Sequence, residues 1–194
     1  LGDVDGDGDL DLVAGNSGQT NKLYLNDGSG GFVSTGTAIG SDSETDFTFS
    51  VVLGDVDGDG DLDLVAGNVG QTNKLYLNDG TSVNGGFNTP GTAIGSETDE
   101  TLSVVLGDVN GDGHLDLVAG NSGQTNKLYL NNGSGGFTAG TGTAIGSDSE
   151  TSKTRSVVLG DVDGDGDLDL VAGNYGQPNK LYLNDGTSVN GGFN

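Results

Sequence analysis

The chain has 194 residues, of which 31% are hydrophobic and 39 are glycine, and it contains no Cys, Met or Trp. Its formal net charge at pH 7 is −23, and it has only six Lys and Arg residues. Binding to nucleic acids or to anionic membranes depends on basic surface, so this composition excludes both classes. No apolar run approaches the roughly 18 residues of a membrane span, so membrane insertion is not expected.

The sequence repeats itself four times. A nine-residue stretch with an oxygen-bearing or polar side chain at every odd position begins at residues 3, 55, 108 and 161, which gives a period of 52 or 53 residues. Repetition at this length is typical of propeller blades or a solenoid-like array. We predict one repeat domain over 1–194, with units at about 1–49, 50–102, 103–155 and 156–194. The first unit lacks its leading strand, and the last unit is incomplete.

Each unit predicts four short strands in the same order. In the second unit, a β-rich segment at 50–54 enters the aspartate stretch and a second segment at 62–66 leaves it. Residues 73–78 alternate apolar and polar side chains, which is the period of a half-buried strand, and 91–95 closes the unit. Gly and Asp residues between these segments indicate tight turns. The sequence therefore predicts an all-β protein without a long helix.

The four aspartate stretches have the spacing of a cation-binding loop. Side-chain oxygens at positions 1, 3 and 5 and Gly at position 6 match the opening of an EF-hand loop, and this sequence adds a carboxylate at position 9. Asp-Gly repeats also form solvated turns, but a turn does not require the carboxylate at position 9. Hard oxygen donors, no Cys and a single His favour Ca²⁺ over softer metals.

We expect about four Ca²⁺ ions, one in each repeat. Positions 1, 3, 5 and 9 bind through side-chain oxygens, and position 7 binds through its backbone carbonyl. The side-chain ligands are Asp3, Asp5, Asp7, Asp11, Asp55, Asp57, Asp59, Asp63, Asp108, Asn110, Asp112, Asp116, Asp161, Asp163, Asp165 and Asp169. The carbonyl ligands are Asp9, Asp61, His114 and Asp167. In the third copy Asn110 keeps a side-chain oxygen, and the side chain of His114 is free to vary because only its carbonyl binds.

The sequence predicts no catalytic site. His114 is the single histidine and stands at a carbonyl position of a metal loop, and the chain has no Cys. No Ser stands in a recognisable nucleophile context. The carboxylates already have a structural role in the loops, so we expect a protein that is not an enzyme.

Aromatic residues recur once or more in each unit. Tyr24, Tyr76, Tyr129 and Tyr182 share one strand position, and we predict that they pack between blades. Phe32, Phe87, Phe137 and Phe193 are predicted to anchor the last strand of each unit. Tyr175 stands where the other copies have Ser17, Val69 and Ser122, which makes it the candidate for an exposed aromatic contact.

Two segments of each unit resemble the FG-GAP and VCBS repeat families, the calcium-loop blades of integrin α-chain-like β-propellers. In the second unit these are residues 51–67 and residues 73–80, the latter followed by Gly-Gly-Phe. The resemblance covers nearly the whole chain and implies four-stranded antiparallel blades, with Ca²⁺ in the hairpin loop between the first two strands. Such propellers commonly have seven blades. This chain has slightly under four, so a closed four-bladed ring, a larger ring shared by two chains and an open array remain alternatives.

We expect a non-catalytic, secreted or cell-surface protein that serves as a scaffold for adhesion or assembly, because extracellular Ca²⁺ modules tolerate weak sites that resting cytosol would not fill. The expected partners are further copies of the chain, neighbouring repeats of a longer chain, glycans or a cell-surface protein. A lectin-like carbohydrate-binding propeller and a subunit of an extracellular filament are the alternative functions.

Overall fold

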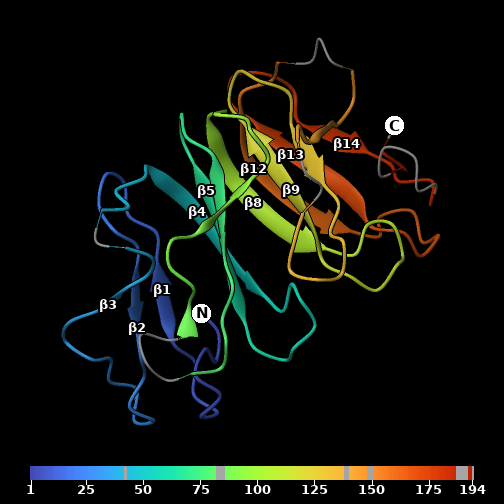
Figure 1. Cartoon of the computed structure of the whole chain (residues 1–194). Coiled ribbons are helices and arrows are strands. Elements are labelled where there is room, and N and C mark those ends of the chain that lie inside the picture. Colours follow the sequence, from blue (N-terminus) through green and yellow to red (C-terminus); the bar gives the residue numbers. More distant parts are fainter. Residues whose placement is uncertain (42, 82–85, 138–139, 148–150, 187–191, 194) are drawn as a thin grey trace.

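The computed structural model describes residues 1–194 except 42, 82–85, 138–139, 148–150, 187–191 and 194. Over this part of the chain the regular elements are β-strands arranged in four antiparallel sheets (Figure 1). The predicted all-β class is confirmed. Among the same residues, a helix with the length and hydropathy needed to cross a membrane does not occur.

Each sheet is built from consecutive strands. The second and third sheets have four strands each, whereas the first and fourth have three, so four-stranded units are confirmed for the two middle repeats. The strands are β1 (Leu12–Ala14), β2 (Lys22–Tyr24), β3 (Thr37–Ala38), β4 (Thr48–Gly54), β5 (Asp63–Asn68), β6 (Asn73–Tyr76), β7 (Thr92–Ile94), β8 (Thr101–Gly107), β9 (Asp116–Asn121), β10 (Lys127–Tyr129), β11 (Thr143–Ala144), β12 (Thr154–Gly160), β13 (Asp169–Asn174) and β14 (Lys180–Tyr182).

The same hairpin opens the second, third and fourth sheets. The last residue of the first strand pairs with the first residue of the second strand, as in Gly54 with Asp63. Gly107 pairs with Asp116 and Gly160 with Asp169 in the same way. In the first repeat an isolated bridge joins Gly2 to Asp11. Each aspartate stretch is therefore the turn of a hairpin, at the place that the resemblance implies.

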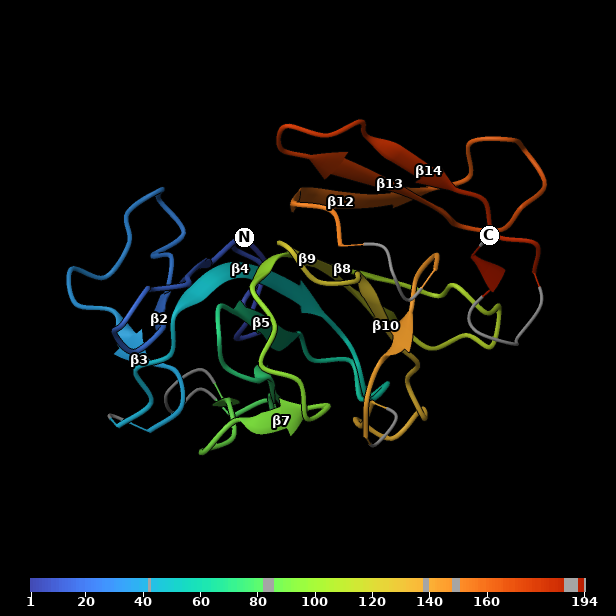
Figure 2. The same ribbon diagram turned by 90° about the horizontal axis from the view of Figure 1, so that it is seen from above.

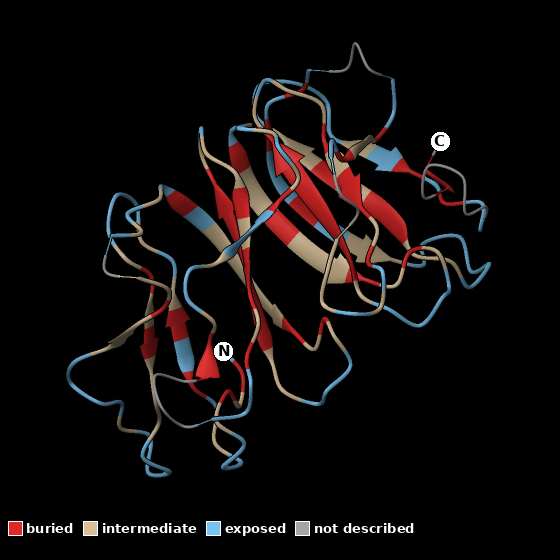
Figure 3. Ribbon diagram, in the orientation of Figure 1, coloured by how far each residue is buried: buried red, intermediate tan, exposed pale blue. Residues whose placement is uncertain are grey.

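The apolar core lies between consecutive sheets. Each of three buried clusters combines residues of two neighbouring repeats, as in Val4 and Leu23 of the first repeat with Leu64 and Tyr76 of the second. Buried residues accordingly fall mainly on the strands of all four sheets (Figure 3). Stacking of repeats thus allows a chain of low hydrophobic content to form a core.

The recurring tyrosines confirm this arrangement. Tyr76, Tyr129 and Tyr182 are buried in the three clusters between repeats, as predicted. Tyr24 of the first repeat, which has no preceding repeat in this chain, is only half-buried.

Glycine allows neighbouring sheets to approach closely. A Cβ atom on Gly54 would lie 2.8 Å from Leu106 Cδ1 and 2.9 Å from Leu115 Cδ1 of the next repeat. Gly2 and Gly107 have the same relation to the leucines that follow them. Seen from above, the sheets follow one another along an arc, and β8 lies between β4 and β12 (Figure 2).

Candidate metal sites

The aspartate loops are curled by two glycines with positive φ. In the second loop Gly58 has φ 79° and Gly60 has φ 100°, and the other loops have the same pair at positions 4 and 6. Residues with a Cβ atom rarely adopt this conformation. The sequence predicted the turn at position 6, and the structure adds a second one at position 4.

The carboxylate at position 1 organises the loop around itself. Asp55 accepts hydrogen bonds from the N–H of Gly58 at 2.7 Å and from the N–H of Gly60 at 3.1 Å. In the first loop the N–H of Gly8 donates to Asp3 at 3.0 Å. The positive-φ glycines therefore turn their N–H groups inward.

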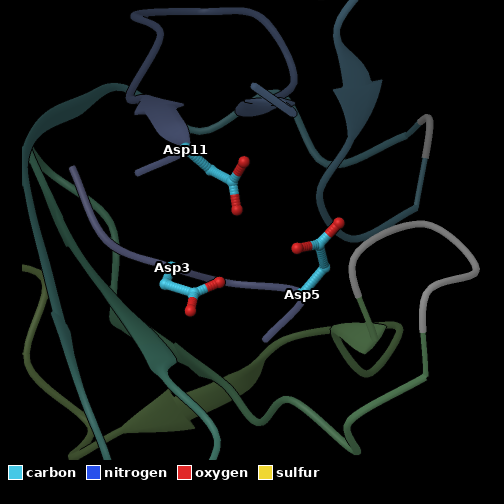
Figure 4. Close-up of side chains that lie close together, drawn as sticks. All are labelled: Asp3, Asp5 and Asp11. Atoms are coloured by element: carbon cyan, nitrogen blue, oxygen red, sulfur yellow. The ribbon is translucent and has the colours of Figure 1, made fainter. Parts of the chain in front are cut away.

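Carboxylates at positions 1, 3 and 9 converge in three of the four loops. Within each loop the ligand atoms lie within 4.8 Å of one another. The triplet of the first loop is Asp3, Asp5 and Asp11; that of the second loop is Asp55, Asp57 and Asp63; that of the fourth loop is Asp161, Asp163 and Asp169. In the first loop the three side chains surround a common space (Figure 4). Three such carboxylates repel one another unless a cation lies among them.

The donor set fits Ca²⁺. All the groups that converge are hard oxygen ligands, which Ca²⁺ prefers. In addition, Asp3 Oδ1 is buried and has no hydrogen-bond partner. A buried carboxylate oxygen without a partner is costly, and a bound cation would satisfy it.

The pKa shifts of the loop carboxylates also favour a bound cation. Burial raises the pKa of Asp63 and of Asp116 to about 6, although each accepts two backbone N–H groups and other loop carboxylates add to the rise. Burial also raises the pKa values of Asp5, Asp57 and Asp163. These ligand positions therefore resist ionisation in the absence of a cation, and a bound divalent cation would reverse this preference.

The position-9 aspartate has a second, structural role that is not apparent from the sequence. Asp63 is inaccessible to solvent and accepts hydrogen bonds from the N–H of Val56 at 2.7 Å and from the N–H of Asn78 at 2.8 Å. The equivalent aspartates of the other three repeats make the same two bonds. This side chain thus joins the start of its loop to the end of the third strand. In the fourth repeat the bonds from the N–H groups of Asn184 and Val162 dominate and lower the pKa of Asp169.

A recurring asparagine ties each of the first three loops to the next repeat, a contact that is not apparent from the sequence. Asn78 Nδ2 donates to the carbonyl of Val4 at 2.9 Å, and Asn131 and Asn184 make the same bond to Val56 and Val109. The valines are at position 2 of the preceding loop. The signal in the sequence is the Asn that ends each Lys-Leu-Tyr-Leu-Asn segment.

Positions 5 and 7 lie outside the carboxylate triplets. Each position-5 side chain accepts a hydrogen bond from the position-7 N–H, at 2.9 Å or 3.0 Å; these are Asp7, Asp59, Asp112 and Asp165. Each position-7 side chain lies against a glycine of the turn after the third strand, where a Cβ atom would collide with it; these are Asp9, Asp61, His114 and Asp167. Binding through position 5 and through the position-7 carbonyl stays a prediction.

The third loop departs from the others. Asp108 and Asp116 hold positions 1 and 9, but Asn110 Nδ2 donates to Asp112 Oδ2 at 2.9 Å. This bond, together with the N–H of His114, lowers the pKa of Asp112. With Asn110 and His114 in place of two aspartates, the third loop has less negative charge to offer a cation.

Comparison with known proteins agrees with the repeat geometry. The FG-GAP-like repeat matches residues 3–66, 55–119 and 108–172, and consecutive matches overlap because each spans two aspartate loops. Comparison with curated proteins gave no match. The matches cover most of the chain and begin at position 1 of the first three loops. The chain therefore belongs to the FG-GAP-like repeat family.

Proposed function

We propose that the chain is a non-catalytic, extracellular scaffold for adhesion or assembly, and that Ca²⁺ bound in the hairpin loops stabilises its stack of repeats. The observation that carries this proposal is the convergence of carboxylates at positions 1, 3 and 9 in three loops. A metal in such a loop also fixes the interface between repeats, because Asn78, whose N–H group donates to position 9 of its own loop, also donates to position 2 of the preceding loop.

The stabilisation would be large for a protein of this size. Binding to the folded state contributes about 1.4 kcal/mol per site when the free Ca²⁺ concentration is ten times Kd. Three or four sites then contribute about 4 to 6 kcal/mol, which is comparable with the whole stability of a typical domain, at about 5 to 15 kcal/mol. Removal of Ca²⁺ is expected to loosen the stack.

Titration calorimetry tests the metal assignment. We expect three or four Ca²⁺ ions per chain, weaker binding of Mg²⁺, and a clear fall in melting temperature in chelator. Asp57→Ala removes a triplet ligand and should lower the Ca²⁺ stoichiometry by one. Glu100→Ala removes an exposed carboxylate outside the loops and should leave the stoichiometry unchanged. No Ca²⁺ binding, or equal loss in both variants, would refute the assignment.

The affinity tests the proposed location. Extracellular Ca²⁺ modules have dissociation constants of about 10⁻⁴ to 10⁻³ M, a range that resting cytosol does not fill. We expect values in this range for the wild-type chain. Sub-micromolar affinity at all sites would contradict an exclusively extracellular role.

Carbohydrate binding is the second candidate function, and Tyr175 favours it. This side chain is exposed, as the sequence predicted, and the guanidinium carbon of Arg155 lies 5.2 Å from its ring centroid. An exposed aromatic ring beside a cation offers both an apolar face and hydrogen-bond donors. A glycan array should show binding that Tyr175→Ala abolishes, and an array without signal would rule this candidate out.

A further inference from the structure

The two ends of the stack expose apolar residues whose counterparts are covered inside it. On the outer side of the fourth repeat, Val162 is 52% exposed and Leu181 is 51% exposed. The counterparts in the second repeat, Val56 and Leu75, are 2% and 1% exposed because the third repeat packs on them. We call Val158, Gly160, Val162, Leu181 and Leu183 the tail face.

The first repeat shows the opposite side of the same interface. Leu1 is 74% exposed and Leu10 is 57% exposed, and Leu12 and Phe32 are also exposed. In the third repeat the equivalent side chains face the second repeat, where Leu106 and Leu115 approach Gly54. We call Leu1, Leu10, Leu12, Tyr24 and Phe32 the head face.

These two faces have the sequence of an interface that the chain already contains. The tail face of the fourth repeat matches the second repeat residue for residue, with Val52, Gly54, Val56, Leu75 and Leu77. The head face matches Leu106, Leu115, Leu117, Tyr129 and Phe137 of the third repeat. The contact between the second and third repeats is therefore a template for a contact between the fourth repeat of one copy and the first repeat of another.

The template includes a metal loop. Gly135, in the turn of the third repeat, packs against Asp57 of the second loop, where its Cβ atom would lie 2.9 Å from Asp57 Cβ. Gly30 holds the same place in the first repeat, and both turns read Gly-Ser-Gly-Gly-Phe. The counterpart of Asp57 in the fourth loop is Asp163, which is exposed. A second copy would cover this ligand with its Gly30 turn.

The hydrogen bonds follow the same pattern. Asn131 Nδ2 bonds both to Leu115 in its own repeat and to Val56 in the preceding loop. Asn26 makes only the bond within its own repeat, to Leu10 at 3.1 Å. By analogy with the bond from Asn131 to Val56, Asn26 Nδ2 of one copy would donate to the Val162 carbonyl on the tail face of another.

We propose that the head face of one copy docks on the tail face of a second copy, so that the chain associates head to tail and the fourth Ca²⁺ loop is completed by its neighbour. This proposal rests on the proposed function, because Ca²⁺ must order the fourth loop. A net charge of −23 on each copy opposes association, and bound Ca²⁺ reduces that repulsion. Ca²⁺ therefore favours the assembly, whereas monovalent salt alone does not order the loop.

Gly160 and Leu10 provide variants that block one face each. Gly160 has no atom within 4 Å of an added Cβ, so the side chain of Gly160→Leu starts in open space on the tail face. Leu10→Ser removes an exposed apolar side chain at a loop position that is not a ligand. Phe49→Ser is the matched control, because Phe49 is also 57% exposed and lies on neither face.

Light-scattering mass in millimolar Ca²⁺ tests the proposal. We expect the wild-type chain and Phe49→Ser to form dimers or larger species that return to the 19.3 kDa monomer in chelator. Leu10→Ser alone and Gly160→Leu alone should stay monomeric. An equimolar mixture of the two should give a species of twice the monomer mass, because one variant keeps an intact tail and the other an intact head.

Two results would overturn the proposal. A wild-type chain that stays monomeric at high concentration, although calorimetry shows bound Ca²⁺, refutes head-to-tail docking and leaves the proposed function standing. Assembly that neither variant prevents places the contact on another surface. Absence of Ca²⁺ binding in the calorimetry refutes the proposed function itself.

Discussion

Replacement of Asn131 by Ala isolates the contribution of one hydrogen bond between repeats. Asn131 is buried, and its Nδ2 group donates to the Val56 carbonyl at 2.8 Å and to the Leu115 carbonyl at 3.0 Å. Asn26 occupies the same place in the first repeat but makes only the second of these bonds. Both side chains also accept a bond from the N–H of the glycine two residues later, Gly133 or Gly28.

The difference between Asn131→Ala and Asn26→Ala is thus the bond to Val56. A buried acceptor left without its donor costs about 1 to 3 kcal/mol. For a chain of this size, 1 kcal/mol corresponds to about 2 to 4 °C in melting temperature. With a central value of ~2 kcal/mol, Asn131→Ala should melt about 4 to 8 °C below Asn26→Ala.

Thermal unfolding followed by circular dichroism in chelator measures this difference without a metal contribution. The gap should widen in Ca²⁺, since Val56 lies within the second metal loop and its carbonyl would no longer be held. Equal melting temperatures for the two variants would refute the inference that the asparagine couples adjacent repeats.

Three further predictions concern packing, pH and the third loop. Gly107→Ala should destabilise the fold by about 1 to 3 kcal/mol through overpacking, since its Cβ would lie 2.7 Å from Leu159 Cδ1. Gly160→Ala, whose Cβ meets no atom within 4 Å, should leave the stability unchanged. Equal denaturant midpoints for the two variants would contradict this prediction. In the metal-free protein the pKa of Asp63 and of Asp116 is about 6, above the ordinary 3.8, so the stability of the fold should fall as pH rises from 3.8 to 6. Over the same range the Ca²⁺ affinity of each site should rise, by at most about tenfold per pH unit, because the carboxylate must lose its proton to bind the ion. Chelator melts and calorimetry across this range check both signs, and a flat profile would contradict them. Asn110→Asp restores the third carboxylate triplet and should strengthen the weakest calorimetric site by about tenfold; unchanged affinity would show that the amide oxygen is an equal ligand.

The strands and the loop were predictable because their signals are local. Alternation of apolar and polar residues over 73–78 gave β6, and the Asp and Gly spacing gave the hairpin turns. The start of β4 was placed two residues late, at residue 50, because Thr48 is polar. In the structure Thr48 is buried, and its hydroxyl donates to Asn68 Oδ1 at 2.7 Å. A polar side chain satisfied across a strand pair is not distinguishable in sequence from one in a solvated loop.

The bonds between repeats were not predictable because their partners are distant and chemically ordinary. Asn131 and Val56 are 75 residues apart, and one partner is a backbone carbonyl that carries no sequence signal. The carboxylate of Asp63 was assigned to the metal from its position in the loop. Its two bonds to backbone N–H groups depend on how the third strand returns to the loop, which spacing within nine residues does not encode.

The position-9 aspartate and the recurring asparagine together link neighbouring metal loops. Asn78 has its backbone N–H bound by Asp63, a ligand position of the second loop, and its side chain bonds to Val4, within the first loop. Asn78 is therefore hydrogen-bonded to both loops. A cation that fixed Asp63 would also fix Asn78, and this would lower the conformational entropy that the first loop must lose to bind a cation. The same relation links the second loop to the third and the third to the fourth. Among the described residues no such asparagine follows the fourth loop, so this loop gains that support only when another repeat packs on the tail face.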